Sequence, residues 1–163
     1  MPFWKQRPKL VAVGEKVAGF RLARLGGGET SLEEMTAAGP ALLAFFKVSC
    51  PVCQMTFPYL ERIRTPGQLP VYGISQNGPE DTQSFNTRFG VTLPTLLDPE
   101  ESGFPVSNAF GISSVPTLFL VERDGRIARV VEGWRKEEIA KLGAQVGINP
   151  FRQGDSVPEW KAG

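Results

Sequence analysis

The sequence predicts an α/β fold in which helices flank a central mixed β-sheet, parallel in its first part and antiparallel at its end. Segments with strand and helix periodicity alternate along the chain. Residues 40–48 and 69–75 are almost continuously apolar, as in strands that are buried on both faces of a sheet. Near the C-terminal end, Asp124-Gly125 has the pattern of a hairpin turn between two further strands.

Length and composition predict one domain. The 163 residues suffice for one hydrophobic core and are few for two, so we expect a single domain over 1–163, with its core at about 14–147. Residues 148–163 predict an irregular tail that packs through Phe151 and Trp160. The net charge is +1 and the charged residues are scattered, which argues against a nucleic-acid partner. We expect a monomer whose partners are proteins or small molecules.

The sequence contains no segment that predicts a membrane span. No apolar run approaches the roughly 18 residues that cross a bilayer. Residues 1–10 are basic but lack the apolar stretch and cleavage site of a signal peptide. We therefore expect a cytoplasmic protein. If an export signal has been removed from the natural protein, the alternative is a periplasmic or other extracytoplasmic location.

The first elements are a strand, a turn and a short helix that precede the first buried strand. Residues 17–25 alternate in the manner of a strand and three glycines follow, which predicts a hairpin-like N-terminal extension. Ser31 and Glu34 have the spacing of a capping box at the start of a helix over 32–39. The apolar run at 40–48 then supplies a central strand.

The remaining elements alternate between helices and strands up to the final helix. After the strand at 40–48, a helix is expected to begin at Pro51, a residue that suits the first helical position. The later helices are predicted at 79–90, 105–111 and 135–146, and the later strands at 69–75, 92–98, 116–122 and 126–131.

The chain has two cysteines, Cys50 and Cys53, at the predicted junction between strand and helix. They are a redox pair, two of four metal ligands, or two buried apolar residues. The sequence has no histidine, which excludes Cys-His and Ser-His-Asp catalysis and leaves a structural zinc site incomplete unless subunits share it. We expect no metal and no cofactor. A pair of inert buried thiols is disfavoured, because a helix N-terminus activates thiols.

The position of the two cysteines predicts different roles for them. A thiolate at a helix N-terminus accepts backbone N–H bonds and faces the positive end of the helix dipole, which lowers its pKa. Cys50 is therefore the expected nucleophile. Cys53, one turn into the helix, is expected to attack the mixed disulfide that Cys50 forms. Pro51 and Val52 lie between them and are expected to tune the redox potential.

Three features together resemble a known family: "CPVC" at 50–53 after an apolar strand, "VPTLFLVERDGRI" at 115–127, and a long insert between them. Over about 14–147 the chain resembles the thioredoxin fold, in the branch of the TlpA and ResA thiol-disulfide oxidoreductases, which is related to the AhpC/TSA peroxiredoxins. Pro116 lies 63 positions after Cys53, which in this branch implies an inserted strand–helix unit.

The resemblance implies a thiol-disulfide oxidoreductase that exchanges electrons with protein disulfides and is recharged by a dithiol electron donor. Val115-Pro116 matches the segment that, in this family, contains a cis-proline, lies beside the two cysteines and pairs with the substrate backbone. The expected substrate-binding residues are Pro51, Val52, Val115 and Pro116.

Several positions depart from the family pattern. Ser49 stands where the branch usually has tryptophan, Thr56 where it often has glutamate, and Ala44 where thioredoxins have a buried aspartate. The sequence therefore offers no obvious carboxylate to accept the proton of Cys53. Lys47 is a candidate for lowering the pKa of a neighbouring thiolate. The alternative is that its stem packs along the strand while its ammonium group reaches solvent, and we favour this alternative.

Two other functions stay open at this point. In a thiol peroxidase, Cys50 would become a sulfenic acid and Cys53 would resolve it. The peroxiredoxin motif Pro-x-x-x-Thr-x-x-Cys is missing, however, because Leu43 and Lys47 occupy the proline and threonine positions. In a non-catalytic sensing module, the disulfide would switch a binding surface, and exposed aromatic residues around Trp134 or in the tail would support this function.

Overall fold

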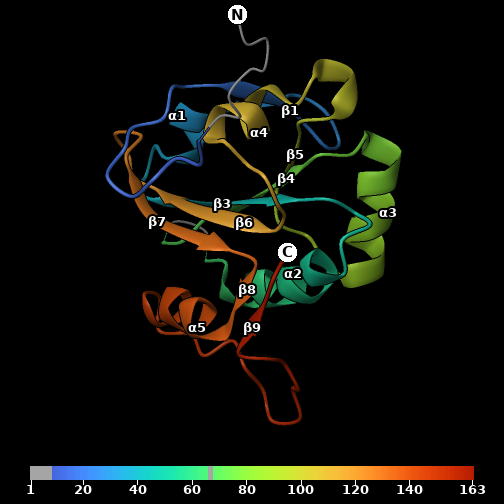
Figure 1. Ribbon diagram of the computed structural model, residues 1–163, viewed down its shortest axis with the longest axis vertical. Coiled ribbons are helices and arrows are strands. Elements are labelled where there is room, and N and C mark those ends of the chain that lie inside the picture. Colours follow the sequence, from blue (N-terminus) through green and yellow to red (C-terminus); the bar gives the residue numbers. More distant parts are fainter. Residues whose placement is uncertain (1–8, 66–67) are drawn as a thin grey trace, which may run out of the picture.

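The computed structural model describes residues 9–65 and 68–163, and it contains a central seven-stranded sheet (Figure 1). The expectation about a signal peptide falls mostly on residues 1–8, which lie outside the described residues. The sheet has the order β2-β1-β5-β4-β3-β6-β7. Its strands are β1 (Arg21–Arg24), β2 (Glu29–Ser31), β3 (Ala41–Phe46), β4 (Val71–Ser75), β5 (Thr95–Leu97), β6 (Thr117–Val121) and β7 (Ile127–Glu132).

The strand directions confirm the predicted mixed sheet. β3, β4 and β5 run parallel to one another, whereas β6 pairs antiparallel with β3, and β7 pairs antiparallel with β6. At the other edge, β1 pairs antiparallel with both β2 and β5, as a hairpin-like extension. β3 lies inside the sheet, between β4 and β6, and all six of its residues are apolar and buried, as expected for an interior strand.

The helices lie on both sides of the sheet (Figure 1). β5 and α4 fall between α3 and β6, where the resemblance implies an inserted strand–helix unit. The predicted helix at 32–39 is shorter than expected: it ends at Met35, because the backbone of its C-cap residue Thr36 departs from helical geometry, with φ −103° and ψ 9°. The helices are α1 (Leu32–Met35), α2 (Pro51–Ile63), α3 (Pro79–Phe89), α4 (Pro105–Phe110) and α5 (Lys136–Ala144), with a 3₁₀ turn at Glu100–Ser102.

Two neighbouring phenylalanines of β3 attach the helices to opposite faces of the sheet. Successive side chains of a strand point to opposite faces. On one face, the ring of Phe46 lies 4.3 Å from that of Phe57 in α2 and 4.9 Å from that of Phe85 in α3. On the other face, the ring of Phe45 lies 5.1 Å from that of Phe110 in α4. β3 is therefore the strand that fixes where α2 begins.

The C-terminal tail is more regular than the sequence predicts. Phe151 packs against Tyr59 and Trp134 as expected, and the indole nitrogen of Trp134 donates to the carbonyl of Pro158. The prediction that Trp160 also packs is wrong, since its side chain is 57% exposed. The tail is held there by backbone pairing between β9 (Trp160–Lys161) and β8 (Trp134–Arg135).

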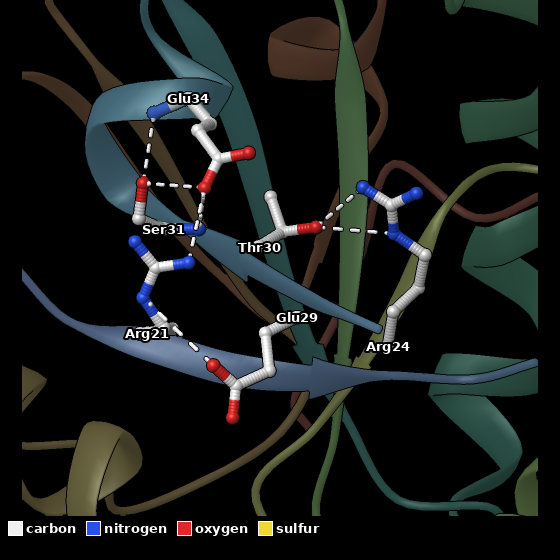
Figure 2. Close-up of polar contacts among 6 residues, drawn as sticks. All are labelled: Arg21, Arg24, Glu29, Thr30, Ser31 and Glu34. Carbon is white, nitrogen blue, oxygen red and sulfur yellow. Dashed lines mark hydrogen bonds and ion pairs between the residues drawn. The ribbon is translucent and has the colours of Figure 1, made fainter. Parts of the chain in front are cut away.

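The turn from β2 into α1 contains the capping box that the sequence predicts (Figure 2). The hydroxyl of Ser31 accepts from the backbone N–H of Glu34 at 3.1 Å, and the carboxylate of Glu34 accepts from the backbone N–H of Ser31 at 3.3 Å. Arg21 donates to the same carboxylate at 3.3 Å. Glu29 only makes a loose, exposed ion pair with Arg21, at 3.9 Å.

These contacts predict different costs for two nearby substitutions. Ser31→Ala removes the hydroxyl that caps α1, so the free energy of unfolding should fall by about 1 kcal/mol. Glu29→Ala removes an exposed ion pair, which is worth close to nothing. Urea unfolding of both variants beside the parent chain measures the difference, and equal losses for the two would contradict the capping role.

Candidate active site

Cys50 is the N-cap residue of α2, as the sequence predicts. Its backbone is extended, with φ −84° and ψ 114°, and its carbonyl accepts from the N–H of Gln54 at 3.0 Å. Its sulfur accepts from the N–H of Cys53 at 3.2 Å. A cysteine sulfur therefore takes the place that a serine or aspartate oxygen fills at most helix N-termini.

The loop between β3 and Cys50 is fixed by two amide side chains. The side-chain oxygen of Asn77 accepts from the N–H of Val48, and the side-chain nitrogen of Gln54 donates to the carbonyl of Val48, both at 3.0 Å. Sequence reasoning missed both residues. Asn77 could have been found from its place two residues after the end of β4, the parallel neighbour of β3, because parallel strands end at the same edge of a sheet. For Gln54 the sequence contains no comparable signal.

The segment before β6, which contains Val115 and Pro116, lies beside Cys50. The peptide bond between Val115 and Pro116 is cis, as the family resemblance implies. Because β6 pairs antiparallel with β3, with Thr117 opposite Phe45, the start of β6 lies next to the end of β3. The sulfur of Cys50 lies 3.4 Å from the carbonyl oxygen of Val115, to which its thiol donates when Cys50 is protonated. The structure thus brings together two sequence motifs that lie more than 60 residues apart.

The environments of the two thiols shift their pKa values in opposite directions. A hydrogen bond from the side-chain thiol of Cys53 is the main cause that lowers the pKa of Cys50 to about 6; burial opposes it, and the backbone N–H groups of Cys53 and Val52 add to it. Burial, helped by the hydrogen bond to Cys50, raises the pKa of Cys53 far above its usual range. Near neutral pH, Cys50 is therefore the thiolate and Cys53 the thiol.

Lys47 has a minor electrostatic effect on this site. Its side chain is exposed, which agrees with the favoured interpretation that its ammonium group reaches solvent. Its positive charge still lowers the pKa of Cys50, but less than each of the hydrogen bonds does.

No carboxylate is among the groups that shift the pKa of Cys53 in the described part of the chain. Ala44 and Thr56, at the positions where relatives of the family carry acids, are both fully buried. The hydroxyl of Thr56 donates to the carbonyl of Val52 at 2.7 Å, so it serves the helix backbone. A side-chain acid that accepts the Cys53 proton is not found at these positions.

The exposed surface of the site is small. Cys50 is partly exposed, Cys53 is completely buried, Pro51 is exposed and Val52 is only 8% exposed. A polar cavity of about 180 Å³ adjoins the cis-proline segment. Its lining includes Lys47, Gln76, Ser107, Asn108, Ser114 and Val115.

The described part of the chain, residues 9–65 and 68–163, shows features of neither a metal site nor a membrane span. No group of three or more His, Cys, Asp or Glu side chains in these ranges is arranged to hold a metal ion. None of the helices in these ranges is long and apolar enough to cross a membrane.

Comparison with known proteins agrees with this geometry. The model of the AhpC/TSA family matches residues 13–130, which is most of the chain. The chain belongs to the AhpC/TSA family. Within this family, the match includes Cys50, Cys53 and the cis-proline segment at Val115-Pro116.

Individual relatives of this AhpC/TSA chain are thiol-disulfide oxidoreductases. It is 30% identical to the thiol-disulfide oxidoreductase ResA of Halalkalibacterium halodurans, over 81% of this chain and 75% of that protein. It is 28% identical to ResA of Geobacillus thermodenitrificans, over 80% of this chain and 75% of that protein. Among solved structures, the thioredoxin domain of a thiol-disulfide oxidoreductase from Bacteroides vulgatus superimposes with a TM-score of 0.73 at 19% identity, covering 83% of this chain and 98% of that one.

These findings confirm three predictions. The chain has the thioredoxin fold, it is similar to the ResA-like branch, and its activity class is thiol-disulfide oxidoreductase.

The pKa shifts predict a simple pH profile for thiol alkylation. The rate of Cys50 alkylation by iodoacetamide should rise through a midpoint near pH 6, since only the thiolate reacts and its pKa is about 6. Cys53→Ala removes the main stabilising hydrogen bond, so the midpoint should rise by roughly one to two pH units.

The matched control is Lys47→Met, which removes the weakest of the causes and should move the midpoint much less than Cys53→Ala. Mass spectrometry of the alkylated peptide measures each profile. A larger shift for Lys47→Met than for Cys53→Ala would contradict the assignment of the hydrogen bond as the main cause.

Proposed function

We propose that the protein exchanges electrons with disulfides of other proteins, with Cys50 as the nucleophile and Cys53 as the resolving thiol. The observation that supports this best is that two thiols at one helix N-terminus differ in exposure and in pKa. Cys50 is partly exposed with a pKa lowered to about 6, whereas Cys53 is buried with a raised pKa. A partly exposed thiolate can attack a substrate, and a buried thiol is kept for the second step.

In the first step, the thiolate of Cys50 attacks one sulfur of the substrate disulfide. The substrate S–S bond breaks, a bond from Cys50 to substrate forms, and the other substrate sulfur leaves as a thiolate. In the second step, Cys53 gives its proton to that leaving thiolate and attacks the sulfur of Cys50. The sulfur that Cys50 held leaves as a thiolate and takes a proton from water, so the substrate is released as a dithiol, reduced by two electrons, and Cys50–Cys53 becomes a disulfide. A dithiol electron donor restores the starting state by the same steps in reverse.

Val115 and Pro116 are the proposed docking place for the substrate backbone. An irregular strand end beside the nucleophile can pair with an extended peptide, and the Val115 carbonyl lies 3.4 Å from the sulfur of Cys50. Of the two residues between the cysteines, only Pro51 presents its side chain to a partner. Val52 can contribute to substrate binding only through its backbone, because its side chain is buried in the core. The polar cavity beside Val115 would receive a flanking side chain of the substrate.

Three expectations about the protein's surroundings stay predictions. These are the monomeric state, the lack of a nucleic-acid partner, and the cytoplasmic location with its extracytoplasmic alternative. Size-exclusion chromatography with light scattering measures the first of them, and fractionation of cells that produce the natural protein measures the last.

No described contact favours the peroxidase alternative. At the motif positions for proline and threonine, Leu43 is fully buried in β3 and Lys47 is exposed. The sensing alternative would be supported by exposed aromatic residues around Trp134 or in the tail. Trp134 is completely buried and packs against Tyr59 and Phe151, whereas Trp160 in the tail is 57% exposed. One exposed aromatic side chain does not account for the opposite pKa shifts of Cys50 and Cys53, which thiol-disulfide exchange uses. The thiol-disulfide exchange activity is therefore the function that we retain.

The two cysteines should behave differently when each is replaced by serine. Cys53→Ser blocks the second step. The variant should therefore accumulate a mixed disulfide between Cys50 and a substrate protein such as insulin. Cys50→Ser removes the nucleophile and should form at least roughly tenfold less mixed disulfide than Cys53→Ser. The reason is that Cys50, with a pKa near 6, is mostly thiolate at neutral pH, whereas Cys53, with a pKa far above neutral, is almost entirely thiol. Non-reducing electrophoresis with mass analysis measures both.

Equal trapping by the two variants would contradict the assigned roles. A parallel assay with hydrogen peroxide separates the peroxidase alternative, in which Cys50 would consume peroxide faster than it reduces a protein disulfide.

A further inference from the structure

The last residues of the sequence, 160–163, extend from β9 towards the proposed substrate site. β9 pairs antiparallel with β8, with Trp134 opposite Lys161 and Arg135 opposite Trp160. Side-by-side pairing of this kind is how an added peptide strand joins a sheet edge. Beyond β9, Gly163 lies against Val115, whose carbonyl oxygen is 3.4 Å from the sulfur of Cys50 at the start of α2.

Gly163 lies directly against the backbone of the cis-proline segment. A Cβ atom placed on Gly163 would lie 2.7 Å from the carbonyl carbon of Val115 and 3.2 Å from the nitrogen of Pro116, and it would come closest to the carbonyl oxygen of Val115. Side-chain carbons do not approach backbone atoms so closely, so only glycine fits there without a shift of the tail.

The carbonyl of Val115 connects the tail to the nucleophile. Its oxygen lies 3.4 Å from the sulfur of Cys50, and Gly163 lies against it. The neighbouring turn is equally close, since a Cβ atom on Gly133 would lie 2.6 Å from the carbonyl oxygen of Lys161. Gly133 itself donates to the carbonyl of Pro116 at 2.8 Å. The tail thus fills the space along Gly133, Val115 and Pro116.

The end of the tail is held less firmly than the part before it. Two contacts anchor residues 158–159: the indole of Trp134 donates to Pro158 at 2.6 Å, and the N–H of Lys136 donates to Glu159 at 3.0 Å. Beyond them, the regular pairing is confined to the two residues of β9. All residues from 158 to 163 are exposed to solvent. Short, exposed strands open at low cost in free energy.

We propose that residues 160–163 are an internal occupant of the substrate site, which an incoming protein disulfide must displace. This inference rests on the proposed function, in which the substrate backbone docks at Val115 and Pro116. The tail and a docked substrate chain need the same side of the Val115 carbonyl, so they exclude each other. The apparent affinity for a protein substrate is then reduced by the fraction of molecules in which the tail is away.

Gly163→Val in the full chain tests this occupancy. The added side chain cannot fit against Val115, so the tail end should leave, and the rate of insulin reduction below saturation should rise by about threefold or more. The matched control is Ala162→Val, at an exposed neighbouring position, which should leave the rate within about 1.5-fold of the parent chain because Gly163 keeps its place.

A second measurement reports on the tail without any turnover. The rate at which a bulky fluorescein maleimide labels Cys50, divided by the rate for iodoacetamide, should rise in Gly163→Val and stay constant in Ala162→Val. An unchanged ratio together with an unchanged or lower insulin rate in Gly163→Val would overturn the inference. Failure of the proposed function has a different signature, because no variant would then reduce insulin although the labelling ratio still reports where the tail lies.

Discussion

The hydrogen bonds between Cys50 and the first turn of α2 are the interaction on which the rest of the site depends. They place a sulfur where helix N-termini have unpaired N–H groups, and they hold it 3.2 Å from the N–H of Cys53. The same place in the helix puts the thiol of Cys53 beside this sulfur, where its hydrogen bond lowers the pKa of Cys50, and buries Cys53, which raises the pKa of Cys53. Two chemically similar thiols thereby acquire distinct properties. If α2 did not begin at a fixed position, the pKa of Cys50 would not be lowered, and Cys50 would not be set to attack before Cys53.

The sheet provides that fixed start and brings a second segment to it. β3 is buried on both faces and ends just before Cys50, and its antiparallel partner β6 begins at the cis-proline segment. One carbonyl, that of Val115, is therefore within reach of the nucleophile, of any peptide that docks there, and of the chain's own tail. This shared carbonyl links the catalytic proposal to the proposal of an internal occupant.

The sequence predicted the elements that have strong local signals, and the structure adds contacts that have none. The apolar run of β3, the Cys50-Pro51 start of α2 and the capping box at Ser31 all carry short-range patterns, and each is confirmed. β9 has only two residues and pairs with a strand about 25 positions away, so it is too short for a hydrophobic periodicity that would predict it. The exposure of Trp160 follows from that pairing, which is why its expected packing was wrong.

The central claim is that Cys50 and Cys53 form one redox couple, and equilibration with glutathione buffers tests it most directly. Thiol trapping and mass analysis at each potential count the free thiols. We predict that a single two-electron transition converts both thiols into an intramolecular disulfide, with a midpoint between about −270 and −120 mV, the range of catalytic dithiols. A chain that forms no Cys50–Cys53 disulfide at any potential would contradict the account.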